Sequence, residues 1–388
     1  MAAHALLSAS ASHRWLNCPA SVRLTEHIPD QGSNYAIEGS MAHEIAELKA
    51  KAYFEGLSKR AVTNRLKIIK GFLKYDGFYS PEMDGHVETY VDYLKECTLG
   101  YQTKPYAVVE KKVDYSNIAP GGFGTCDCLL VGSGLLTVID FKYGKGLPVS
   151  ALNNTQLMLY AIGAVNAYQL MYPLDRVKMV IVQPRLDSIS EFEMTVDDLL
   201  AWGESIKPIA QEAFNGGGEV KPGEHCRFCK IKGNCKARAE ANTAHLEFVG
   251  TDPNLLTFEE VGHFLTLAQT FEPWQKDLKE YALSKSLAGE TIPGWKVVAG
   301  RGSRQFTDQD QAFEILKNEG VDEALLYERK ALTLSAIEKM IGKKRFDETI
   351  GAFVLKSDGA PTLVTESDKR PAIQGKPTAE EAFKDIWI

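Results

Sequence analysis

Residues 122–142 read GFGTCDCLLVGSGLLTVIDFK and contain two apolar runs on either side of a Gly-Ser-Gly turn. Short runs rich in branched residues and bounded by glycine are typical of β-strands, and a two-residue Ser133-Gly134 loop would join these two as a hairpin. In that register Asp127 falls opposite Asp140, with both side chains on one face. The segment therefore predicts an antiparallel strand pair that carries two facing acids.

Facing carboxylates repel each other unless a cation neutralises them. Oxygen-only ligands suit Mg²⁺ or Mn²⁺, and Lys142 is predicted to lie on the same side of the strand as Asp140. A metal held there could lower the pKa of a bound water, and the amine could stabilise charge as it develops. The alternative is a pair of surface acids near a turn with a salt-bridged lysine. This alternative is weakened because Asp140 directly follows the apolar run LLTVI, where a charged side chain is unfavourable unless it has a partner or a function.

The sequence around the hairpin mixes strand and helix patterns. We expect helices over 38–56, 82–98 and 150–170, and strands over 107–113, 126–131, 135–141 and 177–182. This mixture predicts an α/β fold with a central mixed sheet flanked by helices. The pattern then changes at Thr251-Asp-Pro253, so we divide the chain into a domain over 1–245 and an accessory C-terminal α+β region over 251–388, which begins with a helix near 257–287.

The 388 residues carry a formal net charge of −7, which excludes a globally basic nucleic-acid binder. Two local stretches are basic, residues 57–74 and 221–238, and either could neutralise phosphates or be a solvated helix face. No apolar run approaches the ~18 residues of a membrane span. The first residues lack the basic start of a secretory signal, so we expect a cytoplasmic protein without membrane contact.

Seven cysteines, an odd number, argue against a disulfide framework in a cytoplasmic chain. Three of them form a C-x2-C-x5-C cluster that favours a metal site: Cys226, Cys229 and Cys235. Cys18 is the best candidate for a fourth ligand, and His225 is the competing one, which would suit zinc better than an iron–sulfur cluster. We interpret the remaining three as small apolar residues of the core: Cys97, Cys126 and Cys128.

Further polar residues lie on predicted helices and strands. His43 lies one turn into the first helix, and Gln156 and Tyr160 share a helix face four residues apart. Glu110, at the centre of the strand AVVEKKV, is an additional candidate carboxylate. A lone histidine on a helix is usually structural, and the Gln-Tyr pair could contact a phosphate or a base.

Four motifs occur in a fixed order: Gly39-x-x-x-His43, Gly124-x-x-Asp127, Asp140-Phe-Lys142 and Gln156-x-x-x-Tyr160. In this order they resemble the motifs of the PD-(D/E)XK nuclease superfamily, RecB branch. Cys18 and the three clustered cysteines bracket them, which is similar to the iron–sulfur staple of AddB-type and CRISPR-associated adaptation nucleases. The whole chain also resembles a phage-borne exonuclease family. One departure is Cys126, which stands where a proline precedes the first aspartate.

The resemblance implies a restriction-endonuclease-like core that hydrolyses DNA with Mg²⁺ or Mn²⁺. It implies that His43, Asp127, Asp140 and the Phe141 carbonyl bind the metal, and that Lys142 assists the attacking water. Gln156 and Tyr160 would position DNA. Cys18, Cys226, Cys229 and Cys235 would hold a 4Fe–4S cluster.

The expected function is therefore a DNA exonuclease in phage recombination or DNA processing, inside a bacterial host cell. Its expected partners are DNA and a phage recombination or single-strand-binding protein. The chain carries no Walker-type phosphate loop, so we expect no fused helicase motor. The alternative is an inactive DNA-binding or scaffold protein that a metal cluster stabilises.

Overall fold

The computed structural model describes residues 5–29, 32–146, 148–244, 258–299, 307–327 and 332–354, together with Thr365 and Asp368. The chain divides into two compact units, Met1–Val298 and Ala299–Ile388. In the parts that the structure describes, no helix has the length and apolar character to cross a membrane.

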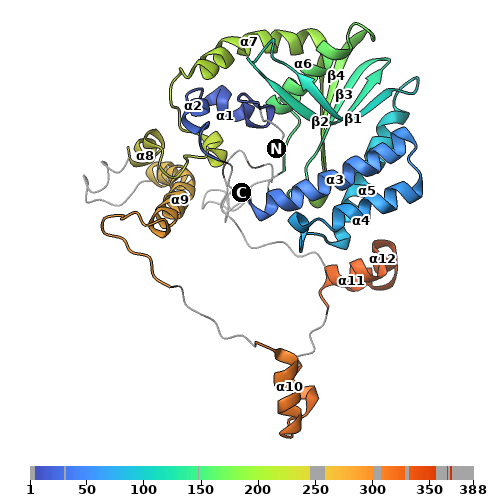
Figure 1. Cartoon of the computed structure of the whole chain (residues 1–388), viewed down its shortest axis with the longest axis vertical. Coiled ribbons are helices and arrows are strands. Elements are labelled where there is room, and N and C mark those ends of the chain that lie inside the picture. Colours follow the sequence, from blue (N-terminus) through green and yellow to red (C-terminus); the bar gives the residue numbers. More distant parts are fainter. Residues whose placement is uncertain are drawn as a thin grey trace, which may run out of the picture. The chain divides into compact units, whose positions relative to one another are not determined.

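A five-stranded sheet is the centre of the first unit (Figure 1). Its strands lie in the order β1-β2-β3-β4-β5. They span Tyr106–Asp114, Phe123–Gly132, Gly134–Phe141, Leu174–Gln183 and Ser188–Thr195. All neighbours are antiparallel except β3 and β4, which are parallel and need a crossover helix between them. The predicted α/β fold with a mixed sheet is confirmed.

The β2–β3 hairpin has the predicted register. Pairing runs from Gly132 with Leu135 to Cys128 with Ile139. The two turn residues, Ser133 and Gly134, both have positive φ, 51° and 75°. Positive φ at both central positions is the signature of a type I′ turn, whose twist matches that of the strands it joins. The turn therefore fixes which residues of the two strands lie opposite each other.

Helices cover both faces of the sheet (Figure 1). On one face, α6 (Thr155–Tyr168) is the β3–β4 crossover and packs under α7 (Val196–Asn215). On the other face lie α3 (Asn34–Glu55) and α5 (Pro81–Leu99), with α4 (Lys59–Lys70) packed on α3. Each face has its own apolar core, which we call the α6 core and the α3 core.

The remaining elements are short apart from one helix. They are η1 (Ala9–Ala11), α1 (Ser12–Asn17), α2 (Ser21–Thr25), η2 (Leu73–Tyr75), η3 (Pro184–Leu186), η4 (Glu224–Phe228), α8 (Lys236–Thr243), α9 (Phe258–Leu287), α10 (Gln309–Asn318), η6 (Glu323–Leu325), α11 (Leu334–Ile341), α12 (Lys343–Ile350) and η7 (Gly351–Phe353). The long helix α9 belongs to the first unit, where its Asp277 pairs with Arg238 at 2.6 Å and with Lys232 at 2.8 Å.

The expected α+β character of the C-terminal region is wrong for the part that the structure describes. From Phe258 to Val354 the described residues form α-helices and 3₁₀ turns, and none is in a strand. Two helices of this region have typical N-cap residues. The side chains of Asp308 and Thr333 accept hydrogen bonds from backbone amides in the first turns of α10 and α11. The predicted boundary between 245 and 251 lies outside the described residues.

Candidate functional site

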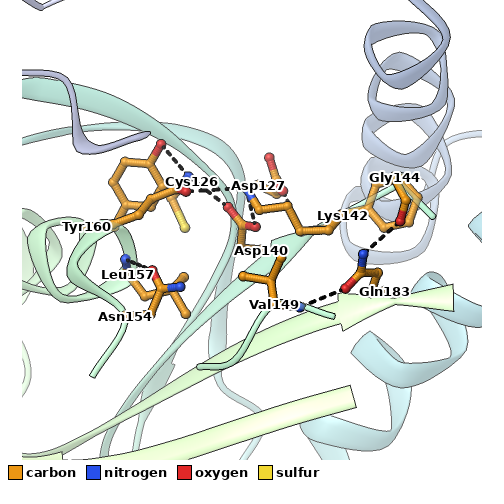
Figure 2. A network of polar contacts seen from close by, with 12 residues as sticks. Cys126, Asp127, Asp140, Lys142, Gly144, Val149, Asn154, Leu157, Tyr160 and Gln183 are labelled. Atoms are coloured by element: carbon orange, nitrogen blue, oxygen red, sulfur yellow. Dashed lines mark hydrogen bonds and ion pairs between the residues drawn. The ribbon is translucent and has the colours of Figure 1, made fainter. Parts of the chain in front are cut away.

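Asp140 lies near the end of β3, between the buried Ile139 and Phe141. Its side chain is buried, with only 4% of the residue exposed. Oδ1 accepts a hydrogen bond from Gln156 Nε2 at 3.2 Å. Oδ2 forms an ion pair with Lys142 Nζ at 3.0 Å, and no other described residue donates to it. Figure 2 shows Asp140 between Tyr160 and Lys142. A carboxylate oxygen can accept from more than one partner, so Oδ2 is still suited to a metal cation beside its ion pair with Lys142.

Gln156, in the first turn of α6, holds the acid and the amine together. Its Oε1 accepts from Lys142 Nζ at 3.3 Å, and its Nε2 also donates to the Tyr160 hydroxyl at 3.3 Å. The side chain of Asn154 caps the helix by accepting from the Leu157 amide at 3.2 Å, which fixes where α6 begins. The predicted i,i+4 pair on α6 therefore does face Asp140.

Gly124 leaves room for the tyrosine ring of this group. A Cβ at residue 124 would lie 2.6 Å from Cε1 of Tyr160, closer than side chains approach. The glycine of the second motif is thus explained by packing: only a residue without a side chain lets β2 pass this close to the ring.

Asp127 on β2 connects the sheet to α3. Its Oδ2 accepts from the Phe141 amide at 2.7 Å, and its Oδ1 lies 3.4 Å from His43 Nδ1 on α3. The ligand atoms of His43, Glu110 and Asp127 all lie within 4.8 Å of one another. Asp140 is not part of this close group, although it is near enough to influence the pKa of His43.

The sheet is irregular at this point. Glu110 has a φ of +54°, and pairing between β1 and β2 passes from Val109–Cys128 to Lys111–Cys126 without a Glu110–Asp127 pair. Cys126 packs in the α6 core and Cys128 in the α3 core, although residues two apart in a regular strand share a face.

This irregularity changes the expected arrangement of the two aspartates. The β2–β3 ladder ends at Cys128 and Ile139, one position before Asp127 and Asp140 would pair. Asp127 turns toward His43, whereas Asp140 stays with Gln156 of α6. The acids therefore do not meet as a simple cross-strand pair: they are drawn to helices on the two faces of the sheet.

Gln183, which the sequence did not indicate as a site residue, fixes the segment after Lys142 (Figure 2). It is 2% exposed at the end of β4, donates to the Gly144 carbonyl at 2.7 Å, and accepts from the Val149 amide at 3.1 Å. A glutamine followed by proline at the end of an apolar strand was the available signal.

The four cysteines of the predicted metal site line one cavity, together with Arg14 and His225. They come from both ends of the first unit: Cys18 follows α1, Cys226 is in η4, Cys229 follows η4, and Cys235 precedes α8. All are free thiols, and all but Cys235 are buried.

Contacts around the cysteine cavity join the two ends of the unit. Arg23 of α2 donates from Nε to the Phe214 carbonyl of α7 at 2.8 Å, and Lys230 donates to the Ile28 carbonyl at 2.7 Å. His225 Nε2 donates to the Lys221 carbonyl at 2.8 Å. Both Cys126 and Cys128 are fully buried in the cores, as predicted, and burial raises the pKa of each thiol.

A family model matches residues 4–371, nearly the whole chain. It is described as "Protein of unknown function (DUF2800)". The chain belongs to this family. A solved structure titled "Crystal structure of SSO0001" is similar at 14% sequence identity over 58% of this chain and 96% of that chain, with a TM-score of 0.24.

The candidate site of this DUF2800 protein contains more acidic than basic side chains. Burial raises the pKa of Glu110 to about 7, and the charges of Asp127 and Glu47 add to the effect. Burial likewise raises the pKa of Asp140 in spite of Lys142. Burial would lower the pKa of Lys142, but the Asp140 carboxylate outweighs it and keeps the amine protonated. The site thus has more carboxylates than cations and would gain from a further positive charge.

Glu110→Gln should stabilise the metal-free protein at pH 8 but not at pH 4. A folded-state pKa of about 7 against 4.5 unfolded means that the folded chain retains a proton which the unfolded chain releases. The residue therefore costs stability as pH rises through this interval. We expect a gain of about 2 kcal/mol at pH 8, reduced for partial exposure. Urea unfolding in EDTA at both pH values measures it; equal effects at both would contradict the shifted pKa.

Proposed function

We propose that this protein is a metal-dependent DNA nuclease of the PD-(D/E)XK type, RecB-like branch, that acts as an exonuclease. The observation that carries the proposal is the buried Asp140, whose Oδ2 has Lys142 as its one described partner while Oδ1 is bonded to Gln156. A buried carboxylate oxygen has more than one acceptor site, so a single lysine leaves Oδ2 with room for a metal ion as a second partner. The ordered motifs support the same assignment.

The donor set fits Mg²⁺ or Mn²⁺. Asp127 and Glu110 would supply carboxylate oxygens and His43 an imidazole nitrogen from the close group, and Asp140 and the Phe141 carbonyl, outside that group, would supply further oxygens. When bound, the ion would polarise a phosphoryl oxygen and lower the pKa of a coordinated water. The excess of acids over cations described above is the condition such an ion would relieve.

The remaining residues have roles that the chain performs itself. Lys142, held protonated by Asp140, would stabilise negative charge on the attacked phosphate. Gln156 fixes the acid and the amine relative to each other through its two bonds. The Tyr160 hydroxyl, bonded to Gln156, would position the DNA strand. On this assignment the protein works with phage recombination or single-strand-binding proteins in the cytoplasm of a bacterial host.

For the cysteine cavity we propose a 4Fe–4S cluster held by Cys18, Cys226, Cys229 and Cys235. Tetrahedral zinc with Zn–S distances near 2.3 Å would bring the sulfurs within about 4 Å of one another. The Nε2 of His225 is already bonded to the Lys221 carbonyl, so the four cysteines are the better ligand set. Four thiolates are the ligands that a 4Fe–4S cluster takes.

The test is a DNA degradation assay with Mg²⁺ or Mn²⁺ on linear and circular duplexes. We expect the parent to degrade linear DNA, EDTA to abolish the activity, and Asp140→Ala and Lys142→Ala to be inactive. Asp197→Ala, at an exposed position in the first turn of α7, is the control that should remain active. Equal activity in all variants would reject the catalytic assignment. A folded parent that binds DNA without degrading it would favour the scaffold alternative.

A further inference from the structure

We propose that α4 binds the phosphate backbone of DNA and leads it to the site beside α3, an inference that rests on the proposed function. Four cations on this helix, Lys59, Arg60, Arg65 and Lys67, form what we call the α4 strip. All four are exposed. Among the residues that the structure describes, none of these four side chains has an ion pair, hydrogen bond or ring contact.

The other basic stretch, 221–238, is different. In the described parts of the chain, Lys232 and Arg238 pair with Asp277, and Lys221 and Lys236 pair with nearby glutamates. Lys230 donates to the Ile28 carbonyl. Lys230, Lys232 and Arg238 are thus tied to the fold, while Lys221 and Lys236 lie in exposed pairs with glutamates, so this stretch has fewer cations without a partner than α4. The two stretches look alike in sequence, and the structure separates them.

The α4 strip is presented by a firmly placed helix. Ser58 caps its start by accepting from the Ala61 amide at 3.2 Å, and the side chain of Ile69 is buried in the α3 core. Arg60 and Lys67 are seven residues apart, which places them on one helix face with Thr63 and Asn64 between them. This face offers two charges and two hydrogen-bonding groups over about 10 Å.

The end of α4 is tied to the helix that carries His43. Just beyond α4, Lys74 pairs with Glu44 at 2.8 Å, and the Tyr75 hydroxyl donates to the same carboxylate at 2.6 Å. Glu44 directly follows His43 on α3. The strip therefore begins away from the site and ends at its edge, without an acidic residue between Leu57 and Lys74. Four unpaired cations followed by Lys70 and Lys74, which pair with Asp84 and Glu44, suit a polyanion that is led along α4 toward His43.

The variant K59Q/R60Q/R65Q/K67Q tests the proposal in the full-length protein. We would measure binding of a fluorescent 30-base-pair duplex in EDTA, which prevents cleavage, over a series of KCl concentrations. The expected affinity loss is about tenfold near 0.1 M salt. The slope of log affinity against log salt concentration should also become shallower, by the equivalent of about two to three phosphate contacts. The matched control K104Q/K276Q/K279Q/K296Q removes four exposed cations that have no partner in the described part of the first unit, and it should change affinity less than twofold.

Unchanged affinity in the α4 variant, equal losses in both variants, or a parent that does not bind the duplex would each overturn the proposal. Its failure is separable from that of the nuclease assignment. With Mg²⁺ and increasing DNA, the α4 variant should show a raised KM and an unchanged kcat, whereas Asp140→Ala should lose kcat and keep its affinity in EDTA. A parent that binds through α4 but cleaves nothing would overturn the nuclease function alone.

Discussion

Asp140→Asn is expected to lower the rate of DNA cleavage at least about a thousandfold while leaving duplex affinity in EDTA nearly unchanged. Asparagine has the same shape, and its carbonyl oxygen can still accept from Gln156. It lacks the negative charge that the proposed metal site requires, and it removes the partner that keeps Lys142 protonated. Single-turnover cleavage of an end-labelled duplex measures the effect separately from binding.

Stability must be followed in the same variant. Asn at 140 leaves the Lys142 amine without its ion pair, which by itself destabilises the fold. We therefore expect a lower melting temperature, with a folded protein still present at 25 °C. Gln156→Ala serves as a milder comparison. It removes the side chain that orients Asp140 but removes no charge, so its cleavage rate should fall far less than that of Asp140→Asn. Equal cleavage rates for the parent and Asp140→Asn would contradict a role for Asp140 in hydrolysis.

Cys229→Ala is expected to damage folding more than any substitution in the nuclease site. Cys18 and Cys226 enclose more than two hundred residues, and a bridge that closes so long a loop restricts the unfolded chain strongly. By the loop-entropy estimate, its loss costs about 5 kcal/mol. We expect protein purified without oxygen to lose its brown colour and absorbance near 400 nm (about the usual iron–sulfur region) and to become sensitive to trypsin.

Cys97→Ala is the matched control, because Cys97 lies on α5 and does not line the cysteine cavity. It should keep the colour, the iron content and the protease resistance of the parent. Unchanged protease resistance in Cys229→Ala would show that the cysteine site does not hold the two distant segments of the chain together. A colourless parent with one zinc per chain would replace the cluster by the zinc site that His225 could complete.

The part of the fold that follows from local pattern could be predicted from the sequence. The Ser133-Gly134 turn and the two apolar runs determine the β2–β3 register, because a slip of one residue would move every side chain to the other face. That Gln156 and Tyr160 share a helix face also follows from spacing, since i and i+4 lie side by side, whereas the contact of that face with Asp140 depends on how α6 packs on the sheet. The strand β5 was missed although its alternation of polar residues with Phe192 and Met194 was visible.

The detailed arrangement of the acids could not be predicted, because it depends on an exception to strand geometry. Nothing in AVVEKKV indicates that Glu110 adopts a positive φ, which non-glycine residues rarely do. The change of face between Cys126 and Cys128 follows from contacts with two different cores, so it is a tertiary effect. Periodicity assumes one face throughout and therefore placed Asp127 directly across from Asp140.

The docking of α1 and α2 against α7 and η4 has a consequence for synthesis of the chain. Trp15 and Val22 are buried in a core that also includes Leu199 and Ala210. A ribosome that adds about 5–20 residues per second needs on the order of 10–40 s to pass from the first pair to the second. During that interval the apolar groups of the leading segment lack the part of their cover that α7 provides. Chaperones that hold nascent chains should therefore associate with this protein early and leave it only late in translation.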